Sequence, residues 1–392
     1  MMIFHCTHCQ QLVFFENVRC LNCGHALAYL PDLSVMAALE QSADGLWRAP
    51  GTASAASPPT SLSATATGPA TPTEPATTTG PATPTEPAAA PAPAYRLCAN
   101  YDRESVCNWA IPADEAHTLC GSCRLTRVIP DLTQPANRAA WYRLEVAKRR
   151  LVYALLGLGL PVRPRQSPGD GGLAFEFLQE TPGGEGWRVL TGHDNGLITI
   201  NIAEADDVRR EQERHRNAEP FRTLLGHFRH EIGHYYWDQL IRGKPHLAEF
   251  RRLFGDERAD YAQALERHYE SGPPADWADR CISAYATAHP WEDWAETWAH
   301  FLHMTDALET AAATGLSLLP LRADEPAMMR TPDPLAPHVP DFDRMIADWL
   351  ALTYVLNNLN RGLGLPDGYP FVLSAPVIGK LRFVHRTLYL MA

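Results

Sequence analysis

Residues 224–242 read LLGHFRHEIGHYYWDQLIR, and this stretch predicts the helix around which the main domain is built. His230 and His234 are four residues apart, so on a helix they share one face and can bind a single zinc ion. Glu231 would lie beside the metal, where it can take a proton from a zinc-bound water. Gly233 would keep side-chain bulk away from the ion. The neighbouring residues are apolar or aromatic, and burying these polar groups without a metal would be costly.

The HExxH pattern is short and occurs by chance, so a catalytic zinc site also needs a third protein ligand. No further histidine follows at the spacing HExxHxxGxxH, so that pattern is absent. Residues 289–303 instead read HPWEDWAETWAHFLH, in which Glu292, Glu296 and His300 recur every four residues on one helix face. Tryptophans surround this polar stripe, which favours a buried polar face over an exposed acidic one. We therefore expect a third ligand on this second helix.

Four cysteines near the N-terminus have the spacing C-x2-C-x10-C-x2-C. Each CxxC turn directs two thiolates at one tetrahedral ion, and four thiolates complete its shell. A segment this small has little core, so zinc binding would supply its folding energy. The alternative is a pair of redox CxxC motifs, but no thioredoxin-like pattern surrounds either pair. The predicted ligands of this zinc ribbon are Cys6, Cys9, Cys20 and Cys23.

A second set of cysteines has the looser spacing C-x8-C-x12-C-x2-C. We interpret it as a second four-cysteine zinc site, formed by Cys98, Cys107, Cys120 and Cys123. In the alternative, only the final CxxC matters and the other two residues are buried thiols. Cys281 lies in an expected helix without a partner and is interpreted as a core residue.

The composition bounds the class of protein. The chain has 392 residues, 45% of them apolar, and a net charge of −11. This acidic balance argues against a nonspecific nucleic-acid binder and a basic membrane-surface protein, since both need a cationic face. We recognise no signal peptide and no membrane-spanning stretch. We therefore expect a cytoplasmic protein, and in that reducing compartment paired cysteines indicate metal binding rather than disulfides.

Changes in composition divide the chain into four parts. We expect a zinc ribbon over 1–48, a second knuckle over 95–130 and a metallopeptidase domain over 131–392. Residues 49–94 are almost entirely Ala, Pro, Thr, Ser and Gly and contain GPATPTEPA twice. Such a segment lacks the apolar side chains that would offset the entropy of ordering it, so we predict a disordered linker. The linker would let the first ribbon move independently.

The hydrophobic pattern predicts an α+β catalytic domain, mostly helical with a small antiparallel sheet, preceded by zinc-ribbon modules. Glycine-rich turns separate the expected strands, and the periodicity after residue 220 is mostly helical. The expected strands cover 173–178, 187–190 and 197–202, and the expected helices cover 136–158, 220–242, 246–270, 274–288, 291–312, 341–361 and 374–390.

The second helical stretch resembles the second motif of the gluzincin metallopeptidases. That motif reads E-x-x-A-E, and EDWAE in this chain matches it. The resemblance implies a zincin-like fold with Glu292 as the third zinc ligand and Glu296 supporting a histidine ligand. The reverse assignment, with Glu296 as ligand and His300 behind it, remains open. It further implies that Tyr285, seven residues before Glu292, stabilises the oxyanion. Tyr285 could equally be a core aromatic residue, and His300 is the other candidate donor.

Most of the chain outside the linker is similar to a bacterial family of zinc-binding metallopeptidases with an N-terminal zinc ribbon. The similarity rests on the first knuckle, CGSCRLTRVIPDL, GLITINIAEADD, FRHEIGHYYW and HPWEDWAETWAHFLH. Members of this family are known mainly as predicted peptidases, so the resemblance implies a fold and a reaction class but no substrate.

The function expected from these features is hydrolysis of peptide bonds by a zinc-dependent endopeptidase in which Glu231 is the general base. Residues 196–202 would form the edge strand with which a peptide substrate pairs. We expect one catalytic zinc ion and one or two structural ones. The alternative is a noncatalytic adaptor that binds a protein partner through its ribbon, with a relic metallopeptidase domain. Hydrolysis of an isopeptide bond is a further alternative.

Overall fold

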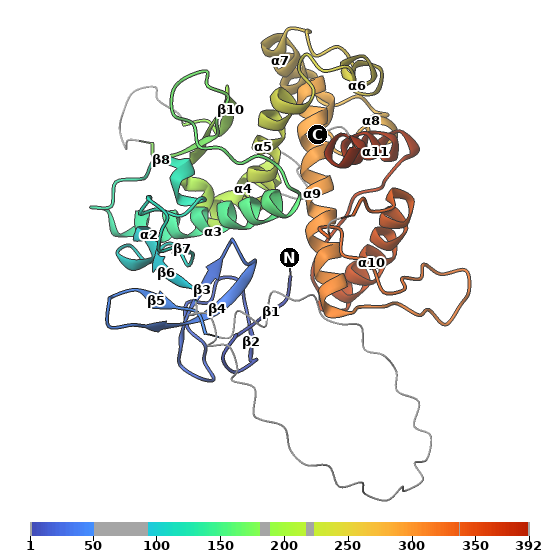
Figure 1. The fold of residues 1–392 in the computed structure, drawn as a ribbon. Coiled ribbons are helices and arrows are strands. Elements are labelled where there is room, and N and C mark those ends of the chain that lie inside the picture. The colour runs from blue at the N-terminus through green and yellow to red at the C-terminus, as the bar shows by residue number, and fades with distance from the viewer. Residues whose placement is uncertain (1, 51–92, 181–188, 217–222, 337, 391–392) are drawn as a thin grey trace, which may run out of the picture. The chain divides into compact units, whose positions relative to one another are not determined.

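The computed structural model describes residues 2–50, 93–180, 189–216, 223–336 and 338–390. Its contacts divide the chain into two compact units, and many of their elements are labelled in Figure 1. The ribbon unit comprises Phe4–Leu97 and Asn108–Thr118, and the helical unit comprises Met1–Ile3, Cys98–Cys107 and Leu119–Ala392. Most of the expected linker, residues 51–92, lies outside the described residues. Each unit is therefore considered by itself.

The ribbon unit consists of short antiparallel strands. Strands β1 (Phe4–His5) and β2 (Leu12–Val13) pair with each other. A second sheet has the order β3-β4-β5-β6-β7. Its strands are β3 (Ala26–Leu30), β4 (Val35–Gln41), β5 (Trp47–Arg48), β6 (Ala94–Leu97) and β7 (Ala110–Pro112).

Strand β5 pairs with β6, although residues 51–92 separate them in the sequence. The two flanking segments therefore belong to one sheet, and the expectation that the first ribbon moves independently was wrong. A packed aromatic group fills the interior of this unit: the ring of Tyr29 lies 5.1 Å from the rings of both Phe15 and Trp109. Periodicity gave no indication of this sheet because most of its strands are only two to four residues long.

The helical unit contains a four-stranded sheet of order β10-β11-β9-β8. Strand β9 (Ala174–Leu178) is parallel to both of its neighbours, β8 (Thr126–Val128) and β11 (Leu197–Asn201). Only β10 (Gly192–Asp194) is antiparallel to its partner, so the expected antiparallel sheet is in fact mixed. Helix α3 (Pro135–Gly157) connects β8 to β9, which is the crossover that parallel strands require.

Strands β10 and β11 form a hairpin around Asn195 and Gly196, whose φ angles are 47° and 85°. Asn-Gly favours such a turn because both central residues adopt positive φ. A Cβ atom on Gly196 would also lie only 2.2 Å from the carbonyl oxygen of Gly172. The hairpin makes β10 the outer strand and places β11 inside the sheet. The expected edge strand over 196–202 is therefore wrong, because an unpredicted strand covers it.

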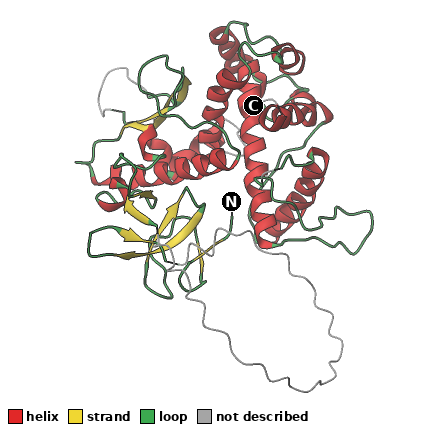
Figure 2. Ribbon diagram, viewed as in Figure 1, coloured by secondary structure: helices red, strands yellow, loops and turns green. Residues whose placement is uncertain are grey.

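Helices make up most of the remaining helical unit (Figure 2). The long helices are α5 (Leu224–Leu240), α9 (Pro290–Thr314), α10 (Phe342–Gly362) and α11 (Ala375–Leu390). The shorter helices are α2 (Ala99–Asp102), α4 (Asp207–Arg216), α6 (Leu247–Phe254), α7 (Tyr261–Ser271) and α8 (Trp277–Arg280), with 3-10 turns η1 (Cys123–Leu125), η2 (Ile202–Ala205) and η3 (Tyr285–Thr287).

Helix α5 packs closely on α9 because Gly233 has no side chain. A Cβ atom at this position would lie 3.0 Å from the Cα of Ala295 and 3.3 Å from the Cβ of Trp298. The indole Nε1 of Trp294 donates a hydrogen bond to the Gly233 carbonyl oxygen, at 2.8 Å. The glycine in HEIGH thus permits the close approach of two helices, whereas the sequence alone had assigned it to the space beside a metal.

Three expected elements differ from the structure. The helix predicted over 246–270 is interrupted at Gly255, whose φ of 107° ends α6, and α7 starts again after the N-cap Asp260. The helix predicted over 274–288 consists only of α8 and η3, separated by the extended residue Cys281. The strand predicted over 187–190 lies partly outside the described residues, and its described part is not a strand.

Candidate metal centres

Helices α5 and α9 bring two histidines and one glutamate together. One ligand atom from each of His230, His234 and Glu292 lies within 4.8 Å of the other two. The Nε2 atom of His230 lies 3.0 Å from Oε2 of Glu292, and that of His234 lies 3.6 Å from Oε1. Thr223 caps the first of these helices, and His289 with Pro290 at position N1 starts the second. Both helices are thereby fixed near the site.

This donor set suits a zinc ion. Two imidazoles and a carboxylate are a ligand set that leaves a fourth position open. Glu292 is almost fully buried, and its Oε2 atom accepts no hydrogen bond from any described residue. A buried carboxylate is costly to ionise unless its charge is compensated, and a cation held by Oε2 and the two imidazoles would compensate it. The residues present therefore fit the metal.

Glu296 lies behind His230 and is one helical turn further along α9. Its Oε1 atom is 2.7 Å from Nδ1 of His230, and its Oε2 atom accepts a hydrogen bond from the hydroxyl of Ser283 at 2.6 Å. Burial would raise the pKa of Glu296, but the hydrogen bond to His230 holds it at about 2. The carboxylate thus fixes the ring so that Nε2 faces Glu292, which is how carboxylates orient metal-binding histidines.

The two candidate oxyanion donors occupy different surroundings. The ring of Tyr285 lies 6.0 Å from that of His230, and burial together with the nearby Glu292 raises the pKa of its hydroxyl. His300 is buried further along α9, where its Nδ1 lies 2.8 Å from the hydroxyl of Tyr369. Burial lowers the pKa of His300 to about 4. Tyr285 is therefore near the donor set, whereas the contacts of His300 are with a different group of residues.

Glu231 is buried on α5 beside these residues. Burial raises its pKa, although the nearby His230 and His234 oppose this shift. Burial and nearby charges, and no side-chain hydrogen bond, act on its pKa among the described residues. The group is therefore available to interact with a water molecule in the site.

Sequence reasoning missed Tyr261, the first residue of α7. Its hydroxyl donates a hydrogen bond to Oε1 of Glu292 at 2.7 Å, and Oε2 is the oxygen without a hydrogen-bond partner among the described residues. The two residues are 31 positions apart, and no sequence pattern links them. The glycine at position 255 was the one sequence feature that could have predicted a helix break, and this break places α7 near Glu292.

His193 on β10 was also missed. Its ring lies 6.2 Å from that of His234 in a nearly parallel orientation, and its Nε2 accepts a hydrogen bond from the amide of Gly196 at 2.8 Å. Burial lowers the pKa of His193 to about 3, so the ring is neutral and Nδ1 carries its proton. The Asn-Gly pair could have predicted the hairpin. It could not have predicted that the ring of His193 lies beside His234.

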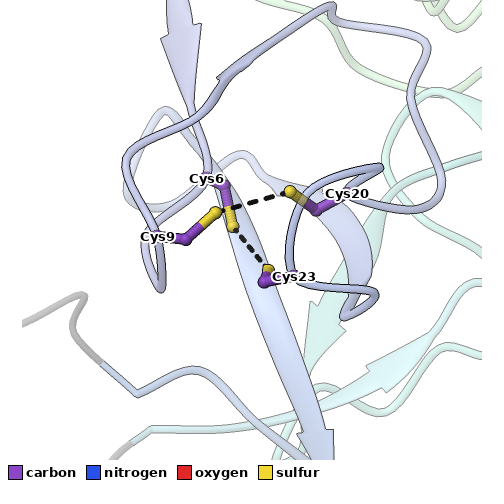
Figure 3. A group of neighbouring side chains, drawn as sticks. All are labelled: Cys6, Cys9, Cys20 and Cys23. Atoms are coloured by element: carbon purple, nitrogen blue, oxygen red, sulfur yellow. Dashed lines mark hydrogen bonds between the residues drawn. The ribbon is translucent and has the colours of Figure 1, made fainter.

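The first set of cysteines is gathered in the ribbon unit (Figure 3). The sulfur atoms of Cys6 and Cys23 are 3.7 Å apart, and those of Cys9 and Cys20 are 3.6 Å apart. Zinc–sulfur bonds of about 2.3 Å give a tetrahedral edge of about 3.8 Å, so the arrangement suits one zinc ion. None of the nine cysteines, all of which are described, forms a disulfide.

The second set of cysteines belongs to the helical unit. All four residues are buried and contribute one sulfur each to a group within 4.8 Å. The sulfur atoms of Cys107 and Cys120 are 3.8 Å apart, and the amide of Cys120 donates a hydrogen bond to Sγ of Cys98. Burial would raise the pKa of Cys107, but the neighbouring thiols and the guanidinium of Arg149 hold it well below its usual range. Burial raises the pKa of Cys120 well above its usual range, and the hydrogen bond with Cys107 does the same for Cys123, so Cys107 is the thiol that favours the thiolate form.

Cys281 has polar neighbours, although we had interpreted it as a core residue. Its sulfur lies 3.7 Å from Nζ of Lys380 and 3.9 Å from Oδ2 of Asp293. Burial raises the pKa of this thiol to about 11, so it is protonated at neutral pH. It belongs to none of the metal-binding groups.

The histidine–glutamate group and the two four-cysteine groups are donor sets of the kind that bind zinc. Residues 137–387 match the family described as "Putative zinc-binding metallo-peptidase", and residues 3–60 and 76–134 match a zinc-ribbon domain. The chain therefore belongs to this metallopeptidase family.

Two relatives are uncharacterized proteins of Mycobacterium bovis and Mycobacterium tuberculosis. Each is 42% identical to this chain over 383 residues, which is 97% of this chain and 94% of the relative. No solved structure matches the chain significantly. Among the described residues, no helix is both long and apolar enough to cross a membrane.

Proposed function

We propose that the helical unit is a zinc-dependent endopeptidase of the gluzincin type. The observation that carries the proposal is the group formed by His230, His234 and Glu292, with Glu296 on the far nitrogen of the first histidine. These three residues would hold the catalytic zinc. When bound, the ion supplies an activated water and a Lewis acid for the scissile carbonyl.

Glu231 would act as the general base. Its buried carboxylate is next to the first ligand in sequence and is free to accept the proton of the attacking water. The same carboxyl group would then give this proton to the leaving amine. The proximity of Tyr285 to His230 supports the tyrosine, in preference to His300, as the donor that stabilises the oxyanion.

An extended peptide would bind along β10, the outer strand of the mixed sheet. One edge of this strand is not paired with another described strand, so its backbone groups can extend the sheet to a substrate. His193 stands on this strand beside His234, and the proton on Nδ1 gives it a hydrogen-bond donor for that substrate. The proposal therefore assigns substrate pairing to residues 192–194 in place of 196–202.

The decisive experiment compares wild-type protein with Glu231→Gln on a library of short peptides. We expect the variant to keep its zinc and its thermal stability and to lose about 10²- to 10⁴-fold in kcat, the usual contribution of a general base. Glu266→Gln, which changes an exposed glutamate on α7, is the matched control. Unchanged turnover in Glu231→Gln would exclude this residue as the base.

A second measurement counts zinc per chain. We expect about three ions in the wild type and about two in His230→Ala/His234→Ala, because both four-cysteine sites would remain intact. Equal counts would show that the helices hold no zinc, and the adaptor alternative would then replace the peptidase. As part of this proposal we place the protein in the cytoplasm, since its many metal-binding thiols need a reducing compartment.

One observation favours an additional binding role for the ribbon unit. Leu12, Phe14, Val18 and Leu21 lie between or beside its CxxC turns, and all four side chains are exposed, that of Leu21 at 95%. Exposed apolar groups of this kind can contact a protein partner or a protein substrate. Phe14→Ser/Leu21→Ser should therefore reduce cleavage of protein substrates and leave short peptides unaffected. Equal loss with both substrates would contradict this role.

A further inference from the structure

Each CxxC turn of the ribbon unit carries a histidine that the four-cysteine site does not use. His8 lies between Cys6 and Cys9, and His25 is two residues after Cys23. The rings of the two histidines stack with their centroids 4.1 Å apart. A nitrogen from each ring and the sulfur of Cys23 lie within 4.8 Å of one another. Three donor atoms of metal-binding type therefore lie close together, one of which is shared with the four-cysteine site.

The surroundings of His25 fix which of its nitrogens is free. Its Nε2 atom lies 3.4 Å from Oε1 of Glu40, which favours the proton on this nitrogen. Its Nδ1 atom is buried and has no hydrogen-bond partner among the described residues. An imidazole with one nitrogen facing a carboxylate and the other unpartnered resembles a metal-binding histidine, whose second nitrogen usually faces such a group. A buried acceptor left unsatisfied would otherwise cost stability.

The donor set determines the kind of ion. Two imidazoles and a thiolate suit zinc and related borderline or soft ions, whereas magnesium and calcium prefer oxygen ligands. Four thiolates around a divalent zinc leave a formal charge of −2, which attracts a second cation. A zinc-bound thiolate also keeps lone pairs on sulfur that can bridge to another metal.

The two four-cysteine sites differ in how closely a cation lies to their sulfur atoms. Arg149 lies at the second site and compensates its negative charge. At the first site the hydrogen-bond donors to Cys9 are the side chain of Asn22 and the amide of Gln11, both of which are neutral. Arg19 donates a hydrogen bond to the carbonyl oxygen of Gly24 beside this site, but its side chain is exposed, whereas Arg149 is buried.

We propose that His8, His25 and Cys23 form an accessory site that holds one zinc-like ion beside the four-cysteine site, with Cys23 bridging the two metals. The side chain of His8 is exposed, so this ion can exchange with solvent more readily than one enclosed by four thiolates. The inference concerns the ribbon unit and is independent of the proposed peptidase activity.

The test uses full-length, zinc-loaded protein dialysed against buffers of increasing free zinc, with metal counted by mass spectrometry. At saturation, the wild type should hold about one ion per chain more than His8→Ala/His25→Ala. His117→Ala is the matched control, because this exposed histidine of the ribbon unit also lies near a glutamate, 3.8 Å from Glu115. It should bind as much zinc as the wild type.

Equal uptake by the wild type and the double variant would overturn the proposal. So would a loss of about two ions, since the histidines would then be needed for the four-cysteine site itself. A decrease in His117→Ala equal to that in the double variant would indicate nonspecific surface binding and would also overturn it.

Cadmium substitution tests whether Cys23 is shared. In the ¹¹³Cd-loaded full-length protein, two cadmium signals should couple through the common sulfur, and the coupling should disappear in the double variant. A wild-type protein that binds the extra ion without coupled signals would overturn the bridging role of Cys23. Glu40→Gln should weaken the accessory site about tenfold, as loss of a carboxylate that supports a ligand usually does.

Discussion

The helical unit contains two candidate metal centres that differ in whether their donor sets are closed or open. At the second four-cysteine site, all donors are buried thiols on short turns, and the charge is compensated by Arg149. At the histidine–glutamate site, three donors come from two long helices, and Glu231 and Tyr285 lie nearby without completing the shell. A closed shell leaves no position for a substrate, whereas an open one does. If the proposed function holds, the comparison shows that one chain uses one metal for folding and another for chemistry.

The largest expected effect is a loss of folding when the closed site is removed, compared with a loss of activity alone when the open site is removed. Cys107→Ser/Cys120→Ser should unfold the helical unit, because a structural zinc site contributes about 10–16 kcal/mol and typical domains are stable by about 5–15 kcal/mol. His230→Ala/His234→Ala should retain the fold and lose activity. Circular dichroism and thermal unfolding of the two variants make the measurement. A folded cysteine variant, or an unfolded histidine variant, would break the comparison.

A smaller effect should follow from the charge at the closed site. Arg149 is buried on α3 and donates a hydrogen bond to the carbonyl oxygen of Val106, next to Cys107. Arg149→Met should destabilise the helical unit by about 3 kcal/mol, since removing one partner of a buried charged contact leaves the other uncompensated. Denaturant unfolding gives this value.

Arg138→Met on the same helix is the control for Arg149. Arg138 also contacts the loop between the first two cysteines of this site, through Glu104, but its side chain is about half exposed. An exposed ion pair contributes about 0–1 kcal/mol, so this variant should change stability little. If both variants lost the same stability, charge compensation at the closed site would not explain the result.

At the open site, Tyr261 provides the corresponding support. Tyr261→Phe removes the hydroxyl that holds Oε1 of Glu292 and should lower zinc affinity about tenfold, without changing thermal stability. Competition with a chromophoric chelator measures the affinity, and cobalt spectra report the ligand geometry. Tyr269→Phe, on the same helix and largely exposed, should behave like the wild type. Unchanged zinc affinity in Tyr261→Phe would leave Glu292 without this positioning residue.

The parts of the site that sequence predicted are those that local spacing controls. His230 and His234 share a face of α5 because they are four residues apart, and the same rule places Glu292 and Glu296 on α9. The histidines, Glu292 and both sets of cysteines are brought together as those spacings required. The long helices α3, α5, α9, α10 and α11 also lie close to their predicted limits.

The parts that sequence reasoning missed depend on tertiary structure. Tyr261 reaches Glu292 because Gly255 breaks a helix that the periodicity would have continued. Strand β10 has only three residues, so no alternation distinguishes it, and the longer β11 was mistaken for the edge. The union of β5 and β6 joins segments on both sides of a long Ala/Pro/Thr stretch. None of these contacts produces a periodic pattern in the local sequence, so none could be predicted from it.

The smallest expected effect sharpens the comparison between the two four-cysteine sites. Cys6→Ser/Cys9→Ser removes ligands of the ribbon unit, whereas Cys107 and Cys120 belong to the unit that carries Glu231. The turnover of short peptides by Cys6→Ser/Cys9→Ser should therefore stay within about twofold of the wild type, as expected for distant, independent sites. Comparing kcat/KM on the same peptide with zinc content checks this. A large loss of turnover would mean that the ribbon zinc supports the helical unit. The two four-cysteine sites would then not act independently.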